Sequence, residues 1–159
     1  MNSSPVMKSF TSNEPFYWTS LDIINNQVAV EKFNQLNRQA RWVSLWNRLT
    51  GHPHTLLPYE QMRSQSKGVT SLDLGIQEIP VKSIVGSLYR AVDYDRQFRP
   101  LNPELKSRWI NVYMTAEHSG WEPIIVHKIG DQYFVEDGHH RVSVARHSGW
   151  DTIEAHVFG

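Results

Sequence analysis

The fold is decided by the stretch Phe134-Val135-Glu136-Asp137-Gly138-His139-His140-Arg141-Val142-Ser143-Val144-Ala145-Arg146. Tyr133 to Val135 is a short β-prone run, and Asp137-Gly138 is a turn signal. After the turn, the apolar residues Val142 and Ala145 are three positions apart, which is typical of a helix. The stretch therefore predicts a strand that leads through a tight turn into a helix.

The first turn of this helix concentrates groups that bind anions. We expect Asp137 to cap the helix by accepting hydrogen bonds from free backbone N–H groups, and Gly138 to let the chain or a ligand approach closely. His139, His140 and Arg141 follow directly. Their side chains add to the unpaired N–H groups and to the positive end of the helix dipole. The sequence predicts a phosphate or carboxylate site here, and the alternative is a capped junction that binds nothing.

The two adjacent histidines do not form a helical metal pair. Neighbouring side chains on a helix point about 100° apart, whereas metal-binding pairs are spaced by three or four residues. His139 and His140 have no histidine partner at that spacing. We therefore predict no metal site.

Composition limits the class of protein. A length of 159 residues suits one domain with an extension. The absence of cysteine excludes disulfides, thiolate catalysis and cysteine-based zinc sites. The start of the chain lacks the pattern of a signal peptide, and no apolar run is long enough to span a membrane, so we expect a cytoplasmic protein without membrane contact. With 16 basic and 16 acidic residues, the net charge argues against a protein whose main task is to neutralise nucleic-acid phosphates.

The chain before residue 69 is predicted to be an extension of the main domain. Residues 1–20 resemble a flexible arm, and residues 21–68 a helical extension that ends in a polar linker. A long helix is expected to end at Gly51, and a short one over Leu56 to Arg63. Spacings of three and four define the apolar face of the long helix, which comprises Val30, Phe33, Leu36, Ala40, Val43 and Trp46.

The other sides of the long helix are basic. They carry Lys32, Arg38, Arg41 and Arg48. One interpretation is a helix that packs on the core and exposes a solvated basic face. The other is a helix that binds a protein or DNA partner.

Residues 69–159 predict a small α+β domain with a mixed sheet. A strand is expected at Ile79-Pro80-Val81. Asn102-Pro103-Glu104 has the cap, the proline and the acidic residue of a helix start, and this helix should run to about His118. The remaining expected elements are strands over Ile124 to Ile129 and Gln132 to Glu136, the helix of the opening stretch as far as about Gly149, and a strand over Thr152 to Val157.

Additional basic residues are candidates for the same anion site. Arg90 lies in a loop that is rich in both charges and ends at Pro100. Lys106 and Arg108 follow the start of the helix at Asn102. We expect these three side chains to assist the residues from Gly138 to Arg141.

The ordered motifs of the second part carry a family resemblance. From about Ile79 to Val157 the chain resembles the ParB/sulfiredoxin superfamily, through a helix and Gly120, the run Pro123-Ile124-x-Val126, a hairpin, and Gly138-x-x-Arg141 at the start of a helix. The resemblance implies that Gly138 to Arg141 hold the phosphates of a nucleotide. ATP, ADP or CTP, with or without Mg²⁺, is the implied ligand.

Departures from the family pattern reduce the number of functions that the resemblance implies for this chain. Partition proteins have Gly-Glu-Arg-Arg where this chain has Gly138-His139-His140-Arg141, and they continue into further domains. Sulfiredoxins place a catalytic cysteine where His139 stands. Because the chain has no thiol, reduction of a sulfinic acid is excluded.

The string Asp137-Gly138-His139-His140-Arg141 is also similar to that of free-serine kinases of this superfamily, and to an uncharacterised group of bacterial ParB-like proteins. A small-molecule kinase needs a carboxylate base, for which Glu78, Glu136 and Asp137 are candidates. A ParB-like nuclease would need several convergent carboxylates for metal ions, and only scattered ones such as Asp93 and Asp95 occur. A non-catalytic module that binds protein or DNA is the remaining alternative, so the sequence leaves open whether the protein is an enzyme.

Overall fold

The computed structural model describes residues 20–65, 72–116 and 121–159. The elements are α1 (Ser20–Thr50), β1 (Leu57–Pro58), α2 (Tyr59–Arg63), β2 (Asp73–Pro80), β3 (Ile84–Ser87), α3 (Lys106–Thr115), β4 (Ile124–Ile129), β5 (Gln132–Asp137), α4 (His139–His147) and β6 (Thr152–Phe158). Short 3₁₀ turns over Val81–Ser83 and Pro103–Leu105 precede β3 and α3. The predicted arm lies outside the described residues, except for Ser20.

One mixed sheet organises the molecule. Its six strands lie in the order β1-β3-β5-β4-β6-β2. The hairpin of β4 and β5 is antiparallel, while β3 pairs with β5 and β6 pairs with β4 in parallel. Strand β2 lies antiparallel to β6 at one edge. The predicted α+β class, with a long N-terminal helix before a mixed sheet, is confirmed.

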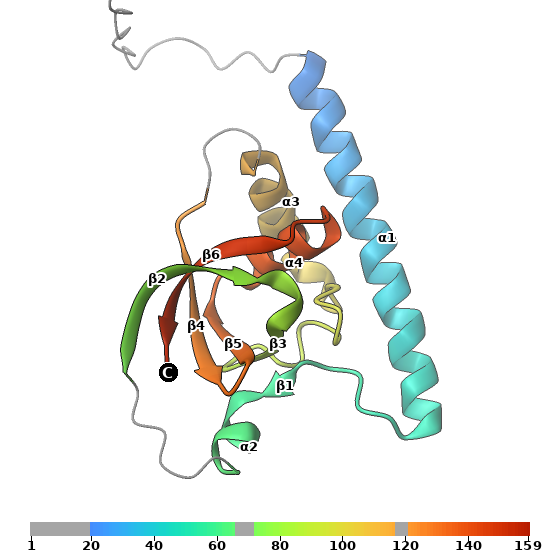
Figure 1. The fold of residues 1–159 in the computed structure, drawn as a ribbon. Coiled ribbons are helices and arrows are strands. Elements are labelled where there is room, and N and C mark those ends of the chain that lie inside the picture. The colour runs from blue at the N-terminus through green and yellow to red at the C-terminus, as the bar shows by residue number, and fades with distance from the viewer. Residues whose placement is uncertain (1–19, 66–71, 117–120) are drawn as a thin grey trace, which may run out of the picture.

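Helices α3 and α4 lie between the sheet and the long helix α1, which runs along one side of the molecule (Figure 1). Trp109 of α3 is fully buried, and the ring of Phe33 on α1 meets it edge-on at 5.8 Å between centroids. One hydrophobic core therefore joins α1 to the sheet. The predicted boundary between residues 68 and 69 stays a prediction, but the core includes residues from both sides of it.

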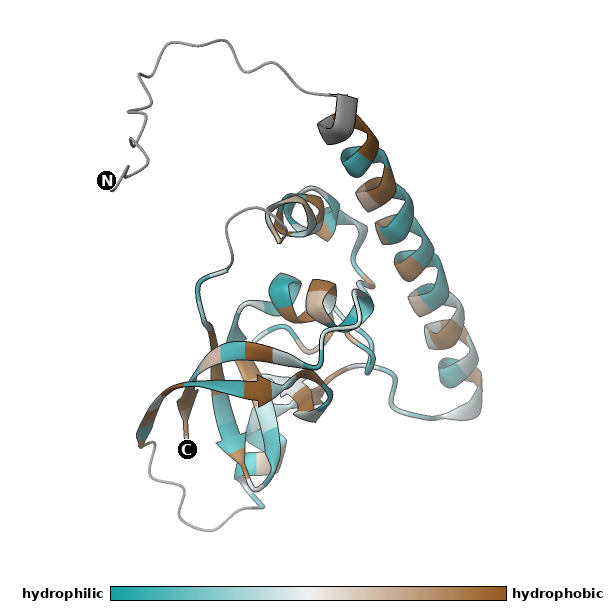
Figure 2. Ribbon diagram, turned by 45° about the horizontal axis from the view of Figure 1, so that its top comes forward, coloured by the Kyte–Doolittle hydropathy of each residue, from teal (hydrophilic) through white to brown (hydrophobic). Residues whose placement is uncertain are grey.

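The apolar face predicted for α1 is correct in its first part and wrong in its last. Phe33, Leu36 and Ala40 are buried, but Val43 is 36% exposed and Trp46 is 68% exposed. For Trp46 the reason is helical geometry, since it lies six positions after Ala40 and therefore about 120° around the helix. Figure 2 shows hydrophobic and hydrophilic residues alternating along the outer side of α1.

Other element predictions are confirmed with changed ends. Asn102 caps the turn before α3 by accepting from the backbone N–H of Glu104 at 3.0 Å. Helix α3 ends at Thr115, and the predicted end at His118 lies outside the described residues. Strand β2 is much longer than the predicted Ile79-Pro80-Val81, and Val81 itself belongs to a 3₁₀ turn.

The sequence did not predict strand β3, although it lies inside the sheet. The strand is only four residues long and contains Gly86, which weakens a strand signal. The tertiary structure explains this glycine, because a Cβ atom there would lie 2.2 Å from the ring of Phe134. Strand β3 matters for the site, since it ends at Ser87 and leads into the loop of residues 88–102, which we call the charged loop.

Within the described residues, no helix combines the length and the apolar character needed to cross a membrane.

Candidate functional site

Gly138 forms the junction between β5 and α4. Its φ of 100° lies in the left-handed region, which favours glycine. A Cβ atom at this position would lie 2.5 Å from Cγ2 of Ile124. The glycine is therefore required by the turn and by the close approach of the chain at β4, and close approach of a ligand stays a prediction.

Asp137 does not cap α4, and this prediction is wrong. Gly138 is the N-cap residue, and within the described residues no side-chain cap hydrogen bond is formed at the start of this helix. The Asp137 carboxylate instead accepts from Nη2 of Arg141, with Oδ2 and Nη2 2.5 Å apart. Asp137 and Arg141 therefore form an i, i+4 ion pair, and the Asp137 side chain is not the helix cap.

Arg141 is engaged in bonds within the protein. Besides Asp137, its guanidinium donates to the backbone carbonyls of Glu122 and Pro123. Only 16% of the side chain is exposed. The residue thus ties the segment before β4 to the first turn of α4, and its role in holding a phosphate stays a prediction.

His139 points into the protein. Its Nε2 atom lies 2.7 Å from Oγ of Ser87, at the end of β3, and both residues are buried. Ser87 Oγ also accepts from the backbone N–H of Arg90 at 2.8 Å. Burial, together with Arg90 and His140, lowers the pKa of His139 to about 4, so the ring is neutral at pH 7.

His140 contacts Tyr94 of the charged loop. Its Nδ1 atom lies 3.0 Å from the hydroxyl of Tyr94, which is itself fully buried. The Nε2 atom is buried and has no hydrogen-bond partner among the described residues. Burial raises the pKa of Tyr94, so its hydroxyl stays protonated and can donate to Nδ1. In that tautomer, Nε2 carries a hydrogen that is not yet bonded.

A hollow of about 560 Å³ lies beside His140, and we call it the arginine pocket. It is formed by the loop after β3 and the start of α3, and its lining comprises Tyr89, Arg90, Asp93, Asn102, Glu104, Leu105, Ser107, Arg108 and His140. The volume is in the range of small-molecule sites, roughly 300–1,000 Å³. Of the predicted phosphate ligands, the fold brings together Arg90, Arg108 and His140.

The pocket lining combines the guanidinium groups of Arg90 and Arg108 with the carboxylates of Asp93 and Glu104. Burial lowers the pKa of His140 to about 4, and the nearby Arg90 and Arg108 add to this effect. Arg90 has a distant ion pair with Asp93, at 3.7 Å between Nη1 and Oδ2, and its side chain is 41% exposed. For Arg108, the described part of the chain shows neither a hydrogen bond nor an ion pair. An anion would therefore meet two guanidinium groups that have weak partners or none.

The other predicted site residues lie away from this lining. Lys106 is on α3 but does not line the pocket. Glu78 lies on the edge strand β2, opposite Glu154 of β6. Glu136 lies 2.6 Å from Nε2 of His127 on the neighbouring strand, and Asp137 is held by Arg141. The carboxylates that do line the pocket are Asp93 and Glu104, which sequence reasoning did not propose as bases.

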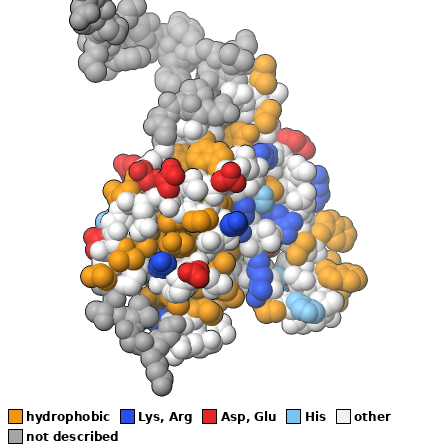
Figure 3. Space-filling model, in the orientation of Figure 1, with side chains coloured by type: hydrophobic (Ala, Val, Ile, Leu, Met, Phe, Trp, Pro, Cys, Tyr) orange, Lys and Arg blue, Asp and Glu red, His pale blue; other side chains and the backbone are white. Residues whose placement is uncertain are grey.

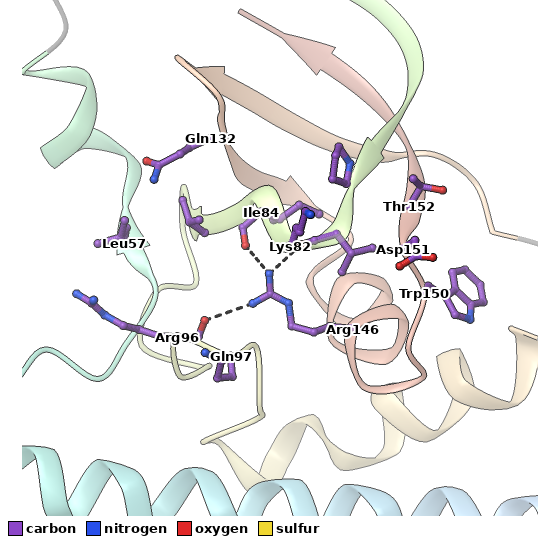
Figure 4. A pocket seen from close by; sticks show the side chains of 13 residues that line it. Leu57, Lys82, Ile84, Arg96, Gln97, Gln132, Arg146, Trp150, Asp151 and Thr152 are labelled. Atoms are coloured by element: carbon purple, nitrogen blue, oxygen red, sulfur yellow. Dashed lines mark hydrogen bonds between the residues drawn. The ribbon is translucent and has the colours of Figure 1, made fainter.

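Another hollow, of about 870 Å³, lies at the opposite end of α4 (Figure 4). Its central cation is Arg146, which donates to the carbonyls of Val81 and Ile84 at 2.8 Å each and to that of Arg96 at 3.4 Å. The guanidinium also lies over the ring of Phe98, 5.1 Å from its centroid. Arg146 is thus a structural anchor, and the other charged residues that line this hollow are Lys82, Arg96 and Asp151.

In the parts of the chain that the structure describes, no group of three or more histidine or acidic side chains is arranged to hold a metal ion. Sequence reasoning also missed Tyr89 and Ser107, which line the pocket, and Tyr94, whose hydroxyl lies beside His140. The Asn102 cap was the signal available for Ser107, because it fixed the start of the helix on which Arg108 and Ser107 lie. The two tyrosines are brought in by the path of the loop alone.

Comparison with known proteins does not assign a function to this site. Neither the family models nor the curated proteins give a match. Among solved structures, the chain is similar to a sulfiredoxin from Arabidopsis thaliana, with 22% identity and a TM-score of 0.39. The alignment covers 52% of this chain and 82% of that one. At this level of similarity, neither a family nor an activity is transferred to this protein.

Proposed function

We propose that this protein binds a nucleotide or another phosphate-bearing ligand in the arginine pocket. The observation that carries the proposal is the convergence of Arg90, Arg108 and His140 on one hollow of the surface, together with the buried Nε2 of His140, which has no hydrogen-bond partner among the described residues. Guanidinium groups suit phosphate because their planar N–H donors match its oxygens. ATP, ADP and CTP are the first ligands to test, each with and without Mg²⁺.

Each polar group has a separate task in this proposal. Arg90 and Arg108 neutralise the phosphate charge, and His140 donates from Nε2 while Tyr94 holds Nδ1. Approach of an anion raises the pKa of His140, because a negative charge favours the protonated ring. Tyr89 lines the pocket and is 77% exposed, so its ring offers a surface on which a base can stack.

Arg108→Ala is the variant that tests the proposal. Binding of ATP, ADP, CTP, GTP and inorganic phosphate is measured by calorimetry and by thermal shift on the full chain. A ligand at about 100 times its dissociation constant stabilises the wild type by roughly 2.7 kcal/mol, which is easily seen. Loss of one charged hydrogen-bonding partner, worth roughly 1.5–3 kcal/mol, should weaken binding by about tenfold or more.

Lys82→Ala is the matched control, since Lys82 is exposed and lines the other hollow. It should bind as the wild type does, and neither variant should melt differently without ligand. The proposal is rejected if no phosphate ligand stabilises the wild type, or if Arg108→Ala binds with unchanged affinity.

A kinase reaction at the same pocket is the alternative with some structural support. Asp93 and Glu104 both line the hollow, so either one is placed to accept a proton from a substrate hydroxyl or to hold Mg²⁺. Glu78, Glu136 and Asp137 do not line this hollow. If the protein transfers phosphate to serine or a similar alcohol, Asp93→Asn or Glu104→Gln should stop product formation and retain nucleotide binding, whereas Glu78→Gln should remain active.

A further inference from the structure

The C-terminal half of α1 carries an exposed apolar stripe that the proposed function does not use. It consists of Trp42, Leu45, Trp46 and Leu49. Their spacing of three and four residues places them on one side of the helix. They are 68%, 52%, 68% and 77% exposed, respectively. Large side chains gathered in this way on a surface mark an interaction site more often than isolated exposed residues do.

A groove with basic walls lies alongside this stripe. It has a volume of about 830 Å³ and lies between α1 and the charged loop, and its lining comprises Asn37, Arg38, Arg41, Trp42, Ser44, Leu45, Arg48, His54, Val92 and Leu101. From Lys32 to Tyr59 the sequence contains four Lys or Arg residues and no Asp or Glu. Figure 3 shows hydrophobic and basic side chains next to one another over this end of α1, at the lower right.

The groove is held in shape before any partner binds. The side-chain amide of Asn37 donates to the carbonyls of Pro100 and Leu101, at 2.9 and 3.1 Å. On the same helix, Ala40 is fully buried against the body. Val92 of the loop is 74% exposed and supplies the wall opposite the helix. These contacts fix the groove in the free protein, so binding of a partner has a smaller cost in conformational entropy.

We propose that the stripe and the groove, which we call the α1 surface, bind an acidic amphipathic segment of a partner protein. Apolar residues of that segment would cover Trp42 and Trp46, and its carboxylates would meet Arg38, Arg41 and Arg48. Trp and Arg are the residue types that contribute most to binding at protein interfaces. The excess of positive charge around the stripe selects a negatively charged occupant.

The same charge disfavours a second copy of this chain as the occupant. Two α1 surfaces placed face to face would bring three arginines from each copy into one interface. No acidic residue between Lys32 and Tyr59 is available to pair with them. Like charges brought together in this way cost several kcal/mol in comparable interfaces.

A peptide selection tests the proposal on the full-length protein. Displayed random peptides of about 16 residues, roughly four helical turns, are selected on immobilised protein, and the enriched peptides are labelled and titrated by fluorescence anisotropy. We expect enriched sequences with an acidic excess and apolar residues at spacings of three and four. Their affinity should fall as salt is raised, because charge attraction is screened.

Two variants remove the two parts of the surface separately. The double variant Trp42→Ala/Trp46→Ala removes the apolar anchors, and Arg41→Glu/Arg48→Glu reverses the charge. Each should weaken the selected peptides by about tenfold or more, which is typical of interface anchors. The matched controls change equally exposed positions elsewhere and should leave affinity unchanged; they are Leu72→Ala/Ile76→Ala and Arg63→Glu/Lys82→Glu.

Several outcomes would overturn the proposal. One is a selection without acidic apolar peptides, or peptides that bind both α1 variants as they bind the wild type. Another is tighter binding to duplex DNA or to vesicles of anionic lipid than to the peptides. A third is dimerisation of the free protein that Trp42→Ala/Trp46→Ala abolishes, since a second copy would then be the occupant. Nucleotide binding at the arginine pocket is measured separately and does not enter these results.

Discussion

The Oγ atom of Ser87 lies 2.7 Å from Nε2 of His139, and this buried pair joins the end of β3 to the first turn of α4. Ser87 is completely buried, so a substrate has no access to its hydroxyl. The same oxygen accepts from the backbone N–H of Arg90. The pair therefore positions the loop that carries Arg90, and it is not a nucleophile with its base.

Ser87→Ala should destabilise the protein, because it leaves Nε2 of His139 and the N–H of Arg90 without their partner. Each unsatisfied buried group costs about 1–3 kcal/mol. The free energy of unfolding, measured in urea, should fall by about that amount. Ser148→Ala, at an exposed position, should change it by less than about 0.5 kcal/mol.

A serine-directed fluorophosphonate provides a second test of the Ser87–His139 pair. If this reagent modified Ser87 in the folded protein, the positioning role would be contradicted. We expect no modification, since a buried hydroxyl beside a neutral histidine is not exposed to the reagent.

Arg141→Ala should lower the stability of the protein in the absence of any ligand. The substitution removes the donor to Asp137 and to the carbonyls of Glu122 and Pro123, and only 16% of this side chain is exposed. A loss of about 2–4 kcal/mol in the free energy of unfolding is expected, since several charged hydrogen bonds are lost together. A wild-type melting temperature combined with loss of phosphate binding would instead make Arg141 a ligand residue.

Gly138→Ala should be far more damaging than Gly130→Ala. Both glycines have positive φ, of 100° and 59°, so both substitutions introduce backbone strain. Only at Gly138 does the new Cβ collide with Ile124, whereas at Gly130 no atom lies within 4 Å. Urea denaturation should show Gly138→Ala to be less stable than the control by about 1–3 kcal/mol, the usual cost of overpacking. Equal losses would show that packing at the junction is loose.

Stability should decrease as the pH falls from 7 to 5. The pKa values of His139 and His140 are lowered to about 4 in the folded protein, from 6.5. Below pH 6.5 the unfolded chain therefore binds more protons than the folded one, and stability is lost as the pH falls towards 4. In His140→Gln, unfolding measured at each pH should show a shallower decrease. An unchanged slope in that variant would indicate that His140 is already protonated in the fold.

The proposed ligand should reduce this pH effect. An anion in the arginine pocket raises the pKa of His140, so proton uptake should accompany binding between pH 5 and 7. Calorimetry in two buffers of different ionisation enthalpy measures this uptake, and His140→Gln is the control in which it should be smaller.

Local signals in the amino-acid sequence determined the order of the helices and strands around the site. The turn at Gly138, the Asn102 cap and the hairpin at Gly130 were predicted correctly because each depends on a few neighbouring residues. The α+β class followed from the alternation of these elements. The predictions of the Asp137 cap and of an apolar face at Val43 and Trp46 were wrong, since Asp137 pairs with Arg141 and the body of the protein does not cover Val43 and Trp46.

Only the tertiary structure decided which of the predicted residues share a site. In the sequence, His139, His140 and Arg141 are equivalent neighbours, yet successive side chains on a helix point about 100° apart. One of them is therefore buried against Ser87, one faces the arginine pocket, and one is bonded to the segment before β4. Arg90 and Arg108 reach the same hollow only because β3, a strand without a clear sequence signal, sets the path of the loop. Long-range packing of this kind depends on contacts between distant residues, which no local pattern encodes.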